Sequence, residues 1–371
     1  MILLPIVLHF AAILIRGDVV GNCDQTEPIT GSICDQTDPI TGSTMSGTTC
    51  TKSHVEHSTT ETGNQISYHR PFLRSALARS LYDRMMREEQ LRKFDKSKWY
   101  KCDMEKLDDE TREKFIEMNC DSETESFIEN CYSKSDWFIT HLFHSMVRSV
   151  LSIFMTSTSI NGFLDRGSMF VFSTEQFSKL YDKLPMVKER KEESSLLDIG
   201  AGDGKVTEIM AKFFGTVHVT EASGVMRRIL SKKGYTVVDI ESWSSEKGMK
   251  YDLISCLNVL DRCDRPISIL RSMKMKVKPG GRILIAVVLP LSQYVESNGK
   301  GNNDHRPTEI LHVNGDSFES HVLSLSNDLL KPNGLQIVYW TRLPYLCEGD
   351  LDLSFYWLHD VVMLVKRIDD E

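Results

Sequence analysis

Apolar runs alternate with amphipathic segments through the second half of the chain, and the pattern predicts alternating strands and helices. Residues 196–198 predict a short strand that ends in the carboxylate of Asp198. Residues 205–211 predict the helix that follows. Between strand and helix, glycine occupies every second position: Gly200, Gly202 and Gly204. A glycine turn that leads into a helix allows close approach of a ligand to backbone N–H groups, so this turn is the first candidate binding site.

Six further apolar or β-branched runs predict the other strands of one sheet. They are residues 216–221, 235–238, 251–261 with its exit, 282–289, 335–340 and 361–365. With the strand before the glycine turn, this makes seven. The order predicts an α/β fold: a parallel sheet that ends in one antiparallel strand, with helices on both faces.

Helical periodicity precedes the sheet. Apolar residues recur every four positions over 68–94, at Leu73, Leu77, Leu81 and Met85, and residues 120–136 and 137–155 continue the helical pattern. We therefore divide the chain into a helical cap over 67–160 and a catalytic domain over 161–371. His141 and His144 lie three apart in the cap, but a solvated helix face explains them better than a metal site, and we predict no metal.

The first 66 residues have a different character. Residues 1–15 are apolar except for His9 and are too short to span a bilayer comfortably, which predicts a signal peptide over 1–21. This places the protein in the endoplasmic reticulum or secretory pathway; a membrane anchor or a mitochondrial presequence is the alternative. Residues 22–66 are rich in Thr and Ser, repeat an 11-residue unit that begins at Cys23 and Cys34, and predict disorder.

Composition, net charge and cysteine spacing argue against several classes of protein. The chain has 371 residues, of which 41% are hydrophobic, so it can bury a substantial core. Its net charge of −8 argues against a nucleic-acid partner. Its nine cysteines form no paired CxxC units, which argues against a zinc site and a dense disulfide framework.

The glycine spacing favours one cofactor class. The pattern D-x-G-x-G-x-G differs from the G-x-G-x-x-G of dinucleotide-binding folds, which disfavours an NAD-dependent dehydrogenase. It resembles motif I of the class I methyltransferases, Rossmann-like enzymes that use S-adenosylmethionine (SAM). Glu221 lies 17 residues past Gly204 at a strand end, where a carboxylate suits the ribose hydroxyls. Trp243 lies where an adenine could stack, or simply in the core. Asn258 and Asp261 leave the fourth strand at the topological switch point, near cofactor and substrate.

Four stretches resemble the DREV family of protein-histidine N-pros-methyltransferases. They are NGFLDRGSMFVF (161–172), SCLNVLDRC (255–263), LP with YVE (289–296) and TRLPYLCEGD (341–350). The resemblance implies SAM-dependent methylation of the pros nitrogen (Nδ1) of histidine in target proteins that carry His-x-His. The loop 298–306 departs from the family pattern, which bears on substrate preference.

The resemblance also implies roles for single residues. Asp198, Gly200, Gly202 and Gly204 belong to the cofactor loop, and Glu221, Asn258 and Tyr345 resemble cofactor contacts. Tyr356 resembles a substrate-pocket tyrosine. For Asp261 we expect a carboxylate that accepts a hydrogen bond from the target histidine Nε2–H and so leaves Nδ1 free to react. The alternatives are core aromatics for the two tyrosines and a helix N-cap for Asp261.

Two other functions stay open at this point. The glycine motif does not select the acceptor, so a methyltransferase acting on a small molecule or another side chain fits as well. A noncatalytic lumenal binding module could also keep this fold. The sequence defines neither the physiological targets nor the oligomeric state.

Overall fold

A computed structural model describes residues 75–135, 167–184, 191–245, 248–295, 306–350 and 352–368. The chain divides into two compact units, Met1–Met86 and Arg87–Glu371, and the sheet belongs to the second. The predicted signal peptide (1–21), the repeat-bearing tail (22–66), and His141 and His144 lie outside the described residues. Among the described helices, none is long and apolar enough to cross a membrane.

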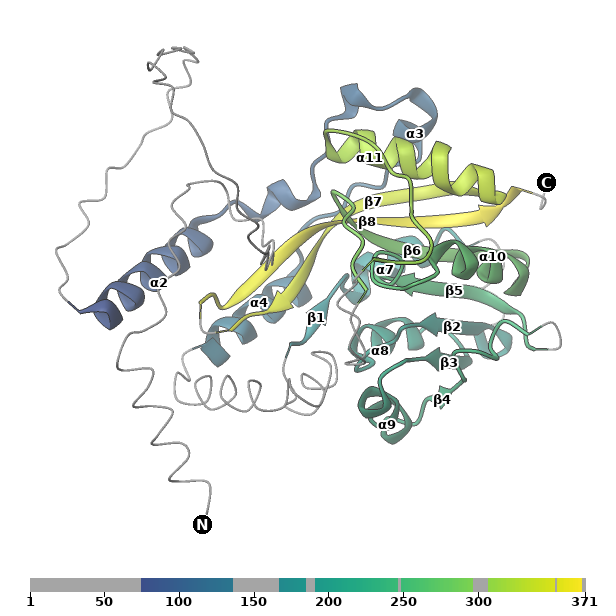
Figure 1. Cartoon of the computed structure of the whole chain (residues 1–371), viewed down its shortest axis with the longest axis horizontal. Helices are drawn as coiled ribbons and strands as arrows, with labels where there is room; N and C mark the ends of the chain where they lie inside the picture. Colours follow the sequence, from purple (N-terminus) through teal and green to yellow (C-terminus); the bar gives the residue numbers. More distant parts are fainter. Residues whose placement is uncertain are drawn as a thin grey trace, which may run out of the picture. The chain divides into compact units, whose positions relative to one another are not determined.

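Eight strands form one sheet in the order β1-β7-β8-β6-β5-β2-β3-β4 (Figure 1). The strands are β1 (Met169–Phe170), β2 (Ser195–Ile199), β3 (Thr216–Thr220), β4 (Thr236–Val237), β5 (Tyr251–Leu257), β6 (Val277–Leu289), β7 (Leu335–Glu348) and β8 (Phe355–Arg367). From β4 to β6 all neighbours are parallel. Strand β8 runs antiparallel to both β6 and β7, between which it lies.

The predicted α/β class is confirmed, and the predicted count of seven strands is one short. The additional strand is β1, which pairs antiparallel with β7. It has two residues, and a segment of that length shows no period in its hydrophobic pattern. Strands β7 and β8 are much longer than predicted, because polar residues such as Arg342 and His359 interrupt their apolar pattern while the backbones stay paired. Strand β6 likewise begins at Val277, before the predicted turn.

Helices and short helical turns connect the strands. The α-helices are α2 (Ala76–Lys93), α3 (Asp109–Glu113), α4 (Ser122–Ser135), α7 (Thr174–Tyr181), α8 (Lys205–Ala211), α9 (Gly224–Lys232), α10 (Pro266–Lys276) and α11 (Phe318–Ser324). A π-helix over Leu325–Leu330 continues α11, and 3-10 turns lie at Lys96–Tyr100, Met104–Lys106, Lys191–Glu193 and Lys331–Asn333. The predicted helix over 205–211 is α8.

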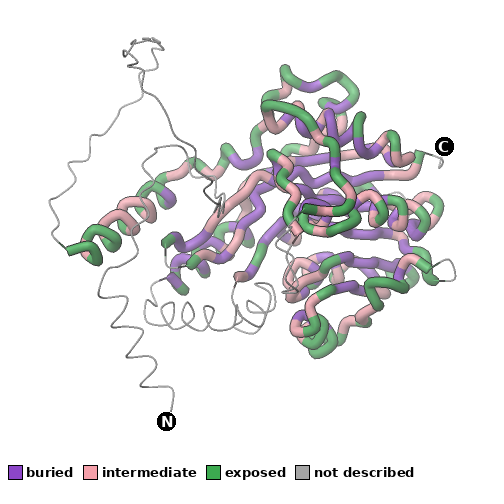
Figure 2. The backbone as a smooth tube through the Cα atoms, viewed as in Figure 1, coloured by how far each residue is buried: buried purple, intermediate pink, exposed green. Residues whose placement is uncertain are grey.

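Two buried apolar clusters fill the two faces of the sheet. Leu196 belongs to the cluster that contains residues of α7 and α8, whereas Leu197 belongs to the one that contains residues of α10 and α11. Successive side chains of a strand point to opposite faces, so these helix pairs cover opposite sides. Buried positions run along the strands between them (Figure 2). Trp243 is buried in the second cluster, which favours its core interpretation over adenine stacking.

The two ends of helix α2 have different surroundings. In α2 the predicted apolar stripe is exposed: Leu77, Leu81 and Met85 are 64%, 46% and 57% exposed, so these residues add nothing to the core. The other end of the helix binds the β7–β8 hairpin, because Glu88 Oε1 accepts hydrogen bonds from Ser354 N (2.6 Å) and Ser354 Oγ (2.8 Å).

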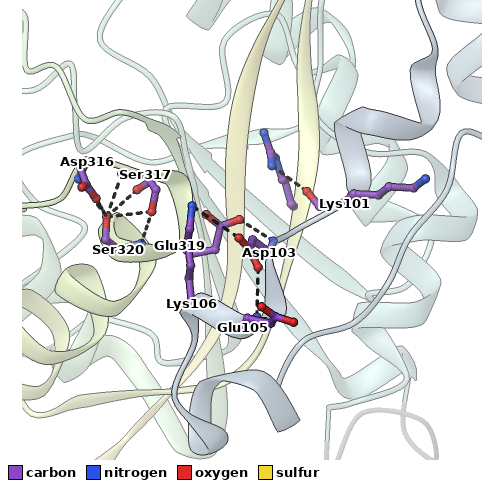
Figure 3. A network of polar contacts seen from close by, with 9 residues as sticks. Lys101, Asp103, Glu105, Lys106, Asp316, Ser317, Glu319 and Ser320 are labelled. Carbon is purple, nitrogen blue, oxygen red and sulfur yellow. Dashed lines mark hydrogen bonds and ion pairs between the residues drawn. The ribbon is translucent and has the colours of Figure 1, made fainter. Parts of the chain in front are cut away.

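Polar contacts hold the segment that follows α2 against the sheet and α11. Asp103 N donates to Oε1 of the buried Glu319 (2.8 Å), and these two residues from distant parts of the sequence point toward each other (Figure 3). Trp340 Nε1 donates to Thr111 O (2.8 Å). The N-terminal segments are therefore fastened directly to β7 and α11.

At the amino end of the parallel strands, Asp252 connects β2, β5 and β6. Its Oδ2 accepts hydrogen bonds from Ser195 N (2.8 Å), Ser195 Oγ (2.8 Å) and Lys278 Nζ (2.7 Å). Burial acts to raise the pKa of Asp252, but the bonds from Lys278 and Ser195 outweigh it, and the pKa is lowered. This carboxylate serves stability and lies at the opposite end of the strands from the glycine turn.

Candidate active site

The three glycines after β2 share a positive φ but differ in what surrounds them. All have positive φ: +73° at Gly200, +57° at Gly202 and +80° at Gly204. A Cβ at Gly200 would lie 2.5 Å from Val259 Cγ2, and one at Gly204 would lie 2.8 Å from Leu230 Cδ2. These two glycines therefore allow the turn to pack against its protein neighbours.

Gly202 meets no such neighbour. A Cβ built there has no atom of the described residues within 4 Å, apart from those of its two chain neighbours. The positive φ favours glycine at this position, and the open Cβ position leaves room for a ligand to approach the backbone. The sequence alone does not separate Gly202 from Gly200 and Gly204.

Asp198 holds the turn in place. It is buried, and its two oxygens accept hydrogen bonds from Thr207 Oγ1 (2.6 Å) on α8 and Ser255 Oγ (2.7 Å) on β5. Burial raises the pKa of Asp198 to about 6, against the opposing effect of the two hydroxyls. Asp198 thus joins β2, β5 and α8 around the glycine turn, a task that the motif does not reveal.

Glu221 follows β3 and reaches across to the same turn. Its Oε2 accepts from Gly202 N (2.9 Å), and its Oε1 accepts from Ser223 N (2.7 Å). An ionised carboxylate has about four acceptor sites, so two are free for the hydroxyls of a ligand. The structure brings Glu221 to Gly202, and its role in binding the ribose stays a prediction.

Asn258, the first residue after β5, has an unusual backbone. Its φ is +55°, and it is the one non-glycine residue with positive φ in the described part of the chain. Its backbone N donates to Ala286 O (2.9 Å), and its Nδ2 donates to Asp360 Oδ2 (2.9 Å). Its buried Oδ1 has no hydrogen-bond partner among the described residues. Residues in sparsely populated conformations concentrate at functional sites.

Asp261 lies on the same loop, and one of its oxygens also lacks a partner. The residue is buried, its Oδ2 lies 3.6 Å from Arg262 Nε, and its buried Oδ1 has no partner in the described ranges. Burial raises the pKa of the Asp261 carboxyl, and Arg262 opposes the rise. The N-cap of α10 is Arg265, without a side-chain cap, so the helix-capping interpretation of Asp261 is wrong.

Asp360 on β8 is a site residue that the sequence did not reveal. It is fully buried, bonds Asn258 through Oδ2, and has a second buried oxygen that pairs with no described residue. Desolvation raises its pKa well above the usual range; Asp261 adds to the rise, while Asn258 and Arg262 oppose it. The available signal was an acid directly before the apolar run 361–365, a position that is also typical of the polar end of a strand.

The two predicted tyrosines have different surroundings. Tyr345 on β7 is buried, and its hydroxyl donates to Met169 Sδ (2.6 Å). Burial raises its pKa well above the usual range; Cys347, Asp360 and Asp261 add to the rise, and Arg262 opposes it. Tyr345 therefore belongs to the group around Asp261.

Tyr356 lies farther along β8. Its hydroxyl donates to Asp350 Oδ1 (2.8 Å) in the β7–β8 hairpin. It shares a face with Asp360 but is four residues away, which is ~13 Å along a strand. The structure therefore does not bring Tyr356 into contact with the group around Asp261; it places the two on one face of the same strand.

The assembled groups suit a cationic ligand that carries hydrogen-bond donors. Three buried oxygens, on Asn258, Asp261 and Asp360, have no partner in the part of the chain that the structure describes. Asn258 and Asp261 follow the carboxyl end of β5, and the glycine turn follows the neighbouring parallel strand β2. No group of three or more His, Cys, Asp or Glu in the described segments could hold a metal ion.

A model of the DREV methyltransferase family matches residues 99–367. The chain belongs to the DREV methyltransferase family. The match includes the helical segments from Trp99 onward as well as the sheet. The family's methyl donor, SAM, is a sulfonium cation with an ammonium group, and the acceptor oxygens and the open Gly202 position fit it.

More distant relatives share only part of the chain. A ubiquinone biosynthesis O-methyltransferase of Aeromonas salmonicida is 33% identical over 103 residues, which cover 25% of this chain and 42% of that protein. One of Aliivibrio fischeri is 27% identical over 139 residues, which cover 31% and 59%. The chain thus spans about half the length of these curated relatives.

Solved structures resemble this chain at low sequence identity. The glycopeptide N-methyltransferase MtfA in complex with SAM has a TM-score of 0.33 at 14% identity, covering 53% of this chain and 87% of that one. A SAM-dependent methyltransferase from Methanosarcina mazei has a TM-score of 0.35 at 15% identity, covering 51% and 97%.

The open position at Gly202 yields a first prediction. Gly202→Arg should abolish SAM binding, because the new side chain extends into the space left for the ligand, whereas its Cβ meets no atom of the described residues beyond its chain neighbours. Its positive φ should cost about 1–2 kcal/mol of stability. Gly234→Arg is the matched control: Gly234 has φ +88° and an equally open Cβ position, but lies after α9. Calorimetry should show normal SAM affinity for Gly234→Arg only; normal affinity in Gly202→Arg rejects this loop as the cofactor site.

The pKa of Asp198 yields a second prediction. Because its pKa rises from 3.8 to about 6 on folding, its stabilising contribution is complete below about pH 4 and is lost as pH rises through about 6. Compared with Asp198→Asn, the wild type should therefore lose free energy of unfolding over this interval. Asp252 has a lowered pKa, so the wild type should instead gain over Asp252→Asn as pH rises. The Asp252 difference develops below about pH 4, so denaturant titrations from about pH 2 to 8 are needed to measure both differences. A pH-independent difference for Asp198→Asn contradicts the assignment.

Proposed function

We propose that this DREV methyltransferase transfers the methyl group of SAM to the Nδ1 atom of histidine in target proteins that carry His-x-His. The observation that carries the proposal is the buried Asp261 Oδ1, which pairs with no described residue at the carboxyl end of β5. An imidazole N–H is a donor of the right kind for this acceptor. The resemblance of the segments around residues 255–263 and 341–350 to histidine methyltransferases supports the same acceptor.

The site geometry and the family motif support a set of cofactor residues. Gly202 gives room for the ligand, Glu221 offers acceptor sites for ribose hydroxyls, and Asn258 and Tyr345 line the side next to β5 and β7. Asp198, Gly200 and Gly204 hold the loop that carries them. When bound, SAM supplies a methyl group whose carbon–sulfur bond breaks, with its electron pair going to sulfur, as the acceptor nitrogen bonds to carbon.

Asp261 has to orient the acceptor. An imidazole with a pKa near 6.5 is mostly neutral at pH 7 and needs no strong base. It reacts at Nδ1 only if the proton sits on Nε2, and a carboxylate that accepts from Nε2–H selects that tautomer. The same carboxylate stabilises the imidazolium that forms, which then releases its Nε2 proton to solvent. Arg262 stays beside Asp261 and favours its ionised form.

Tyr356 is the proposed contact for the remainder of the target segment. It lies on the face of β8 that carries Asp360, ~13 Å along the strand, and its hydroxyl is held by Asp350. An extended peptide of about four residues spans that distance. Positioning of this kind, rather than acid–base power, is the main source of rate in the proposed mechanism.

The remaining alternatives concern acceptor and location. Membership in a methyltransferase family weighs against a noncatalytic binding module. The relatives named as ubiquinone O-methyltransferases keep a small-molecule acceptor as the second candidate. We further propose that residues 1–21 direct the protein into the secretory pathway.

Asp261→Asn tests the catalytic proposal. Methylation of a His-x-His peptide should fall about 10²-fold or more, because an amide can present its N–H and select the wrong tautomer. SAM affinity should stay nearly unchanged. Activity of both proteins should decline below about pH 6, because protonation of the target histidine removes its nucleophilic lone pair. Single-turnover rates, SAM affinity and melting temperature should be measured on the same sample.

Asp264→Asn is the matched control, since it removes a charge from the same loop. Asp264 Oδ1 accepts from Thr308 N and Thr308 Oγ1, and an asparagine oxygen can accept both bonds. Its turnover should stay near normal. A lowered melting temperature with a normal rate in Asp261→Asn would reject the catalytic role, and methyl transfer to a quinol but to no peptide would favour the second acceptor.

A further inference from the structure

The bond between Asp360 and Asn258 spans the sheet. Asp360 lies on β8 and Asn258 follows β5, and the whole of β6 lies between these two strands. The two side chains meet over β6, whose Val288 pairs with Asp360 and whose Ala286 oxygen receives the Asn258 N–H. A contact between non-adjacent strands is unnecessary for the sheet itself, because every ladder here is already paired by backbone bonds.

Asp360 is also a poor choice for stability. It is fully buried in a strand whose next residues are Val361 and Val362, and only one of its oxygens has a partner among the described residues. Burying a carboxyl with incomplete hydrogen bonding is costly, and an apolar residue of similar volume is often as stable or more so. Its presence therefore calls for a task that valine could not perform.

The task that the geometry offers is to orient the Asn258 amide. Asp360 Oδ2 accepts a hydrogen bond from Asn258 Nδ2 (2.9 Å), so the amide nitrogen of Asn258 faces Asp360. The Oδ1 of Asn258 must then face away from Asp360, and it is buried without a partner in the described part of the chain. Without Asp360, nothing in those residues would distinguish the two orientations of the amide.

The order of the strands indicates which part of the cofactor meets that oxygen. Glu221 follows β3, the glycine turn follows β2, and Asn258 follows β5, so the three sites lie in that order along the carboxyl edge. With the ribose at Glu221, the amino-acid end of the cofactor extends past Gly202 toward β5. Its ammonium group is the donor that the Asn258 oxygen lacks.

We propose that Asp360 is a positioning residue for the cofactor: it fixes the Asn258 amide so that its Oδ1 accepts a hydrogen bond from the cofactor's ammonium group. This rests on the proposed placement of the cofactor between Glu221 and Asn258. It does not depend on which acceptor the enzyme methylates.

Binding of two ligands by the free protein tests the proposal. S-adenosylhomocysteine carries the ammonium group, and 5′-methylthioadenosine lacks the whole amino-acid portion. In Asp360→Val, affinity for S-adenosylhomocysteine should fall about tenfold or more, which corresponds to about 1.4 kcal/mol and the lower end of a charged hydrogen bond. Affinity for methylthioadenosine should stay within about twofold. The melting temperature should fall somewhat, because the buried Asn258 Nδ2 loses its acceptor, so the difference between the two ligands is the deciding measurement.

Two further variants make the result decisive. Asp360→Asn should lose less affinity for S-adenosylhomocysteine, because an amide partner leaves the orientation of Asn258 unfixed without excluding the productive one. The exchange Asn258→Asp with Asp360→Asn should bind better than either single change, because position 258 then presents an oxygen in both orientations. Asp252→Asn, the carboxylate at the other end of β5, should lower the melting temperature and leave both affinities unchanged.

Several outcomes would overturn the proposal. Unchanged affinity for S-adenosylhomocysteine in Asp360→Val, or an equal loss for both ligands, would show that Asp360 serves the fold alone. If Asp360→Val does not fold, failure of the exchange variant to bind better than the single variants would also show a purely structural role. A wild-type protein that binds both ligands but methylates no histidine would reject the proposed acceptor and leave this inference standing.

Discussion

The buried carboxylate of Asp198 is the interaction on which the site depends. By accepting the hydroxyls of Thr207 and Ser255 it joins the end of β2 to the first turns of α8 and to the middle of β5. The glycine turn can then adopt three positive φ angles between fixed ends. The loop that carries Asn258 and Asp261 also follows β5. Asp198 therefore connects the glycine turn to the strand that leads into this loop.

Two further side chains of the site come from the long β7–β8 hairpin. Tyr345 and Asp360 follow Gly204 by more than 140 residues in the sequence, yet the charge of Asp261 raises the pKa of both. The segment from Trp99 to Thr111 supports this hairpin through its contacts with β7 and α11. This explains in physical terms why the family match begins at residue 99 rather than at the sheet.

Local patterns predicted the parts of the molecule that local interactions determine. The strand–turn–helix around Gly202 and the order of β2, β3 and β5 follow from apolar periodicity, and α8 has the predicted bounds. Partners distant in sequence left no such signal. The sequence did not reveal Asp360, because its partner Asn258 lies some 100 residues earlier. Trp243 could be assigned to the core only from the structure, in which it shares a buried cluster with Tyr251 and Leu197. The helical period of α2 predicted an apolar face, but this face is exposed. A helical period indicates where the apolar residues lie and does not identify a partner that buries them.

The place of β8 in the sheet has a consequence for biosynthesis. It follows every other described strand in the sequence, yet it lies between β6 and β7, and it carries Asp360. While the chain is still on the ribosome, β6 presents an unpaired edge of apolar residues, and such edges invite association with other chains. When β8 enters the sheet, it covers the edge of β6 and at the same time brings Asp360 into the site. The nascent chain therefore loses its exposed strand edge and completes its site in the same step.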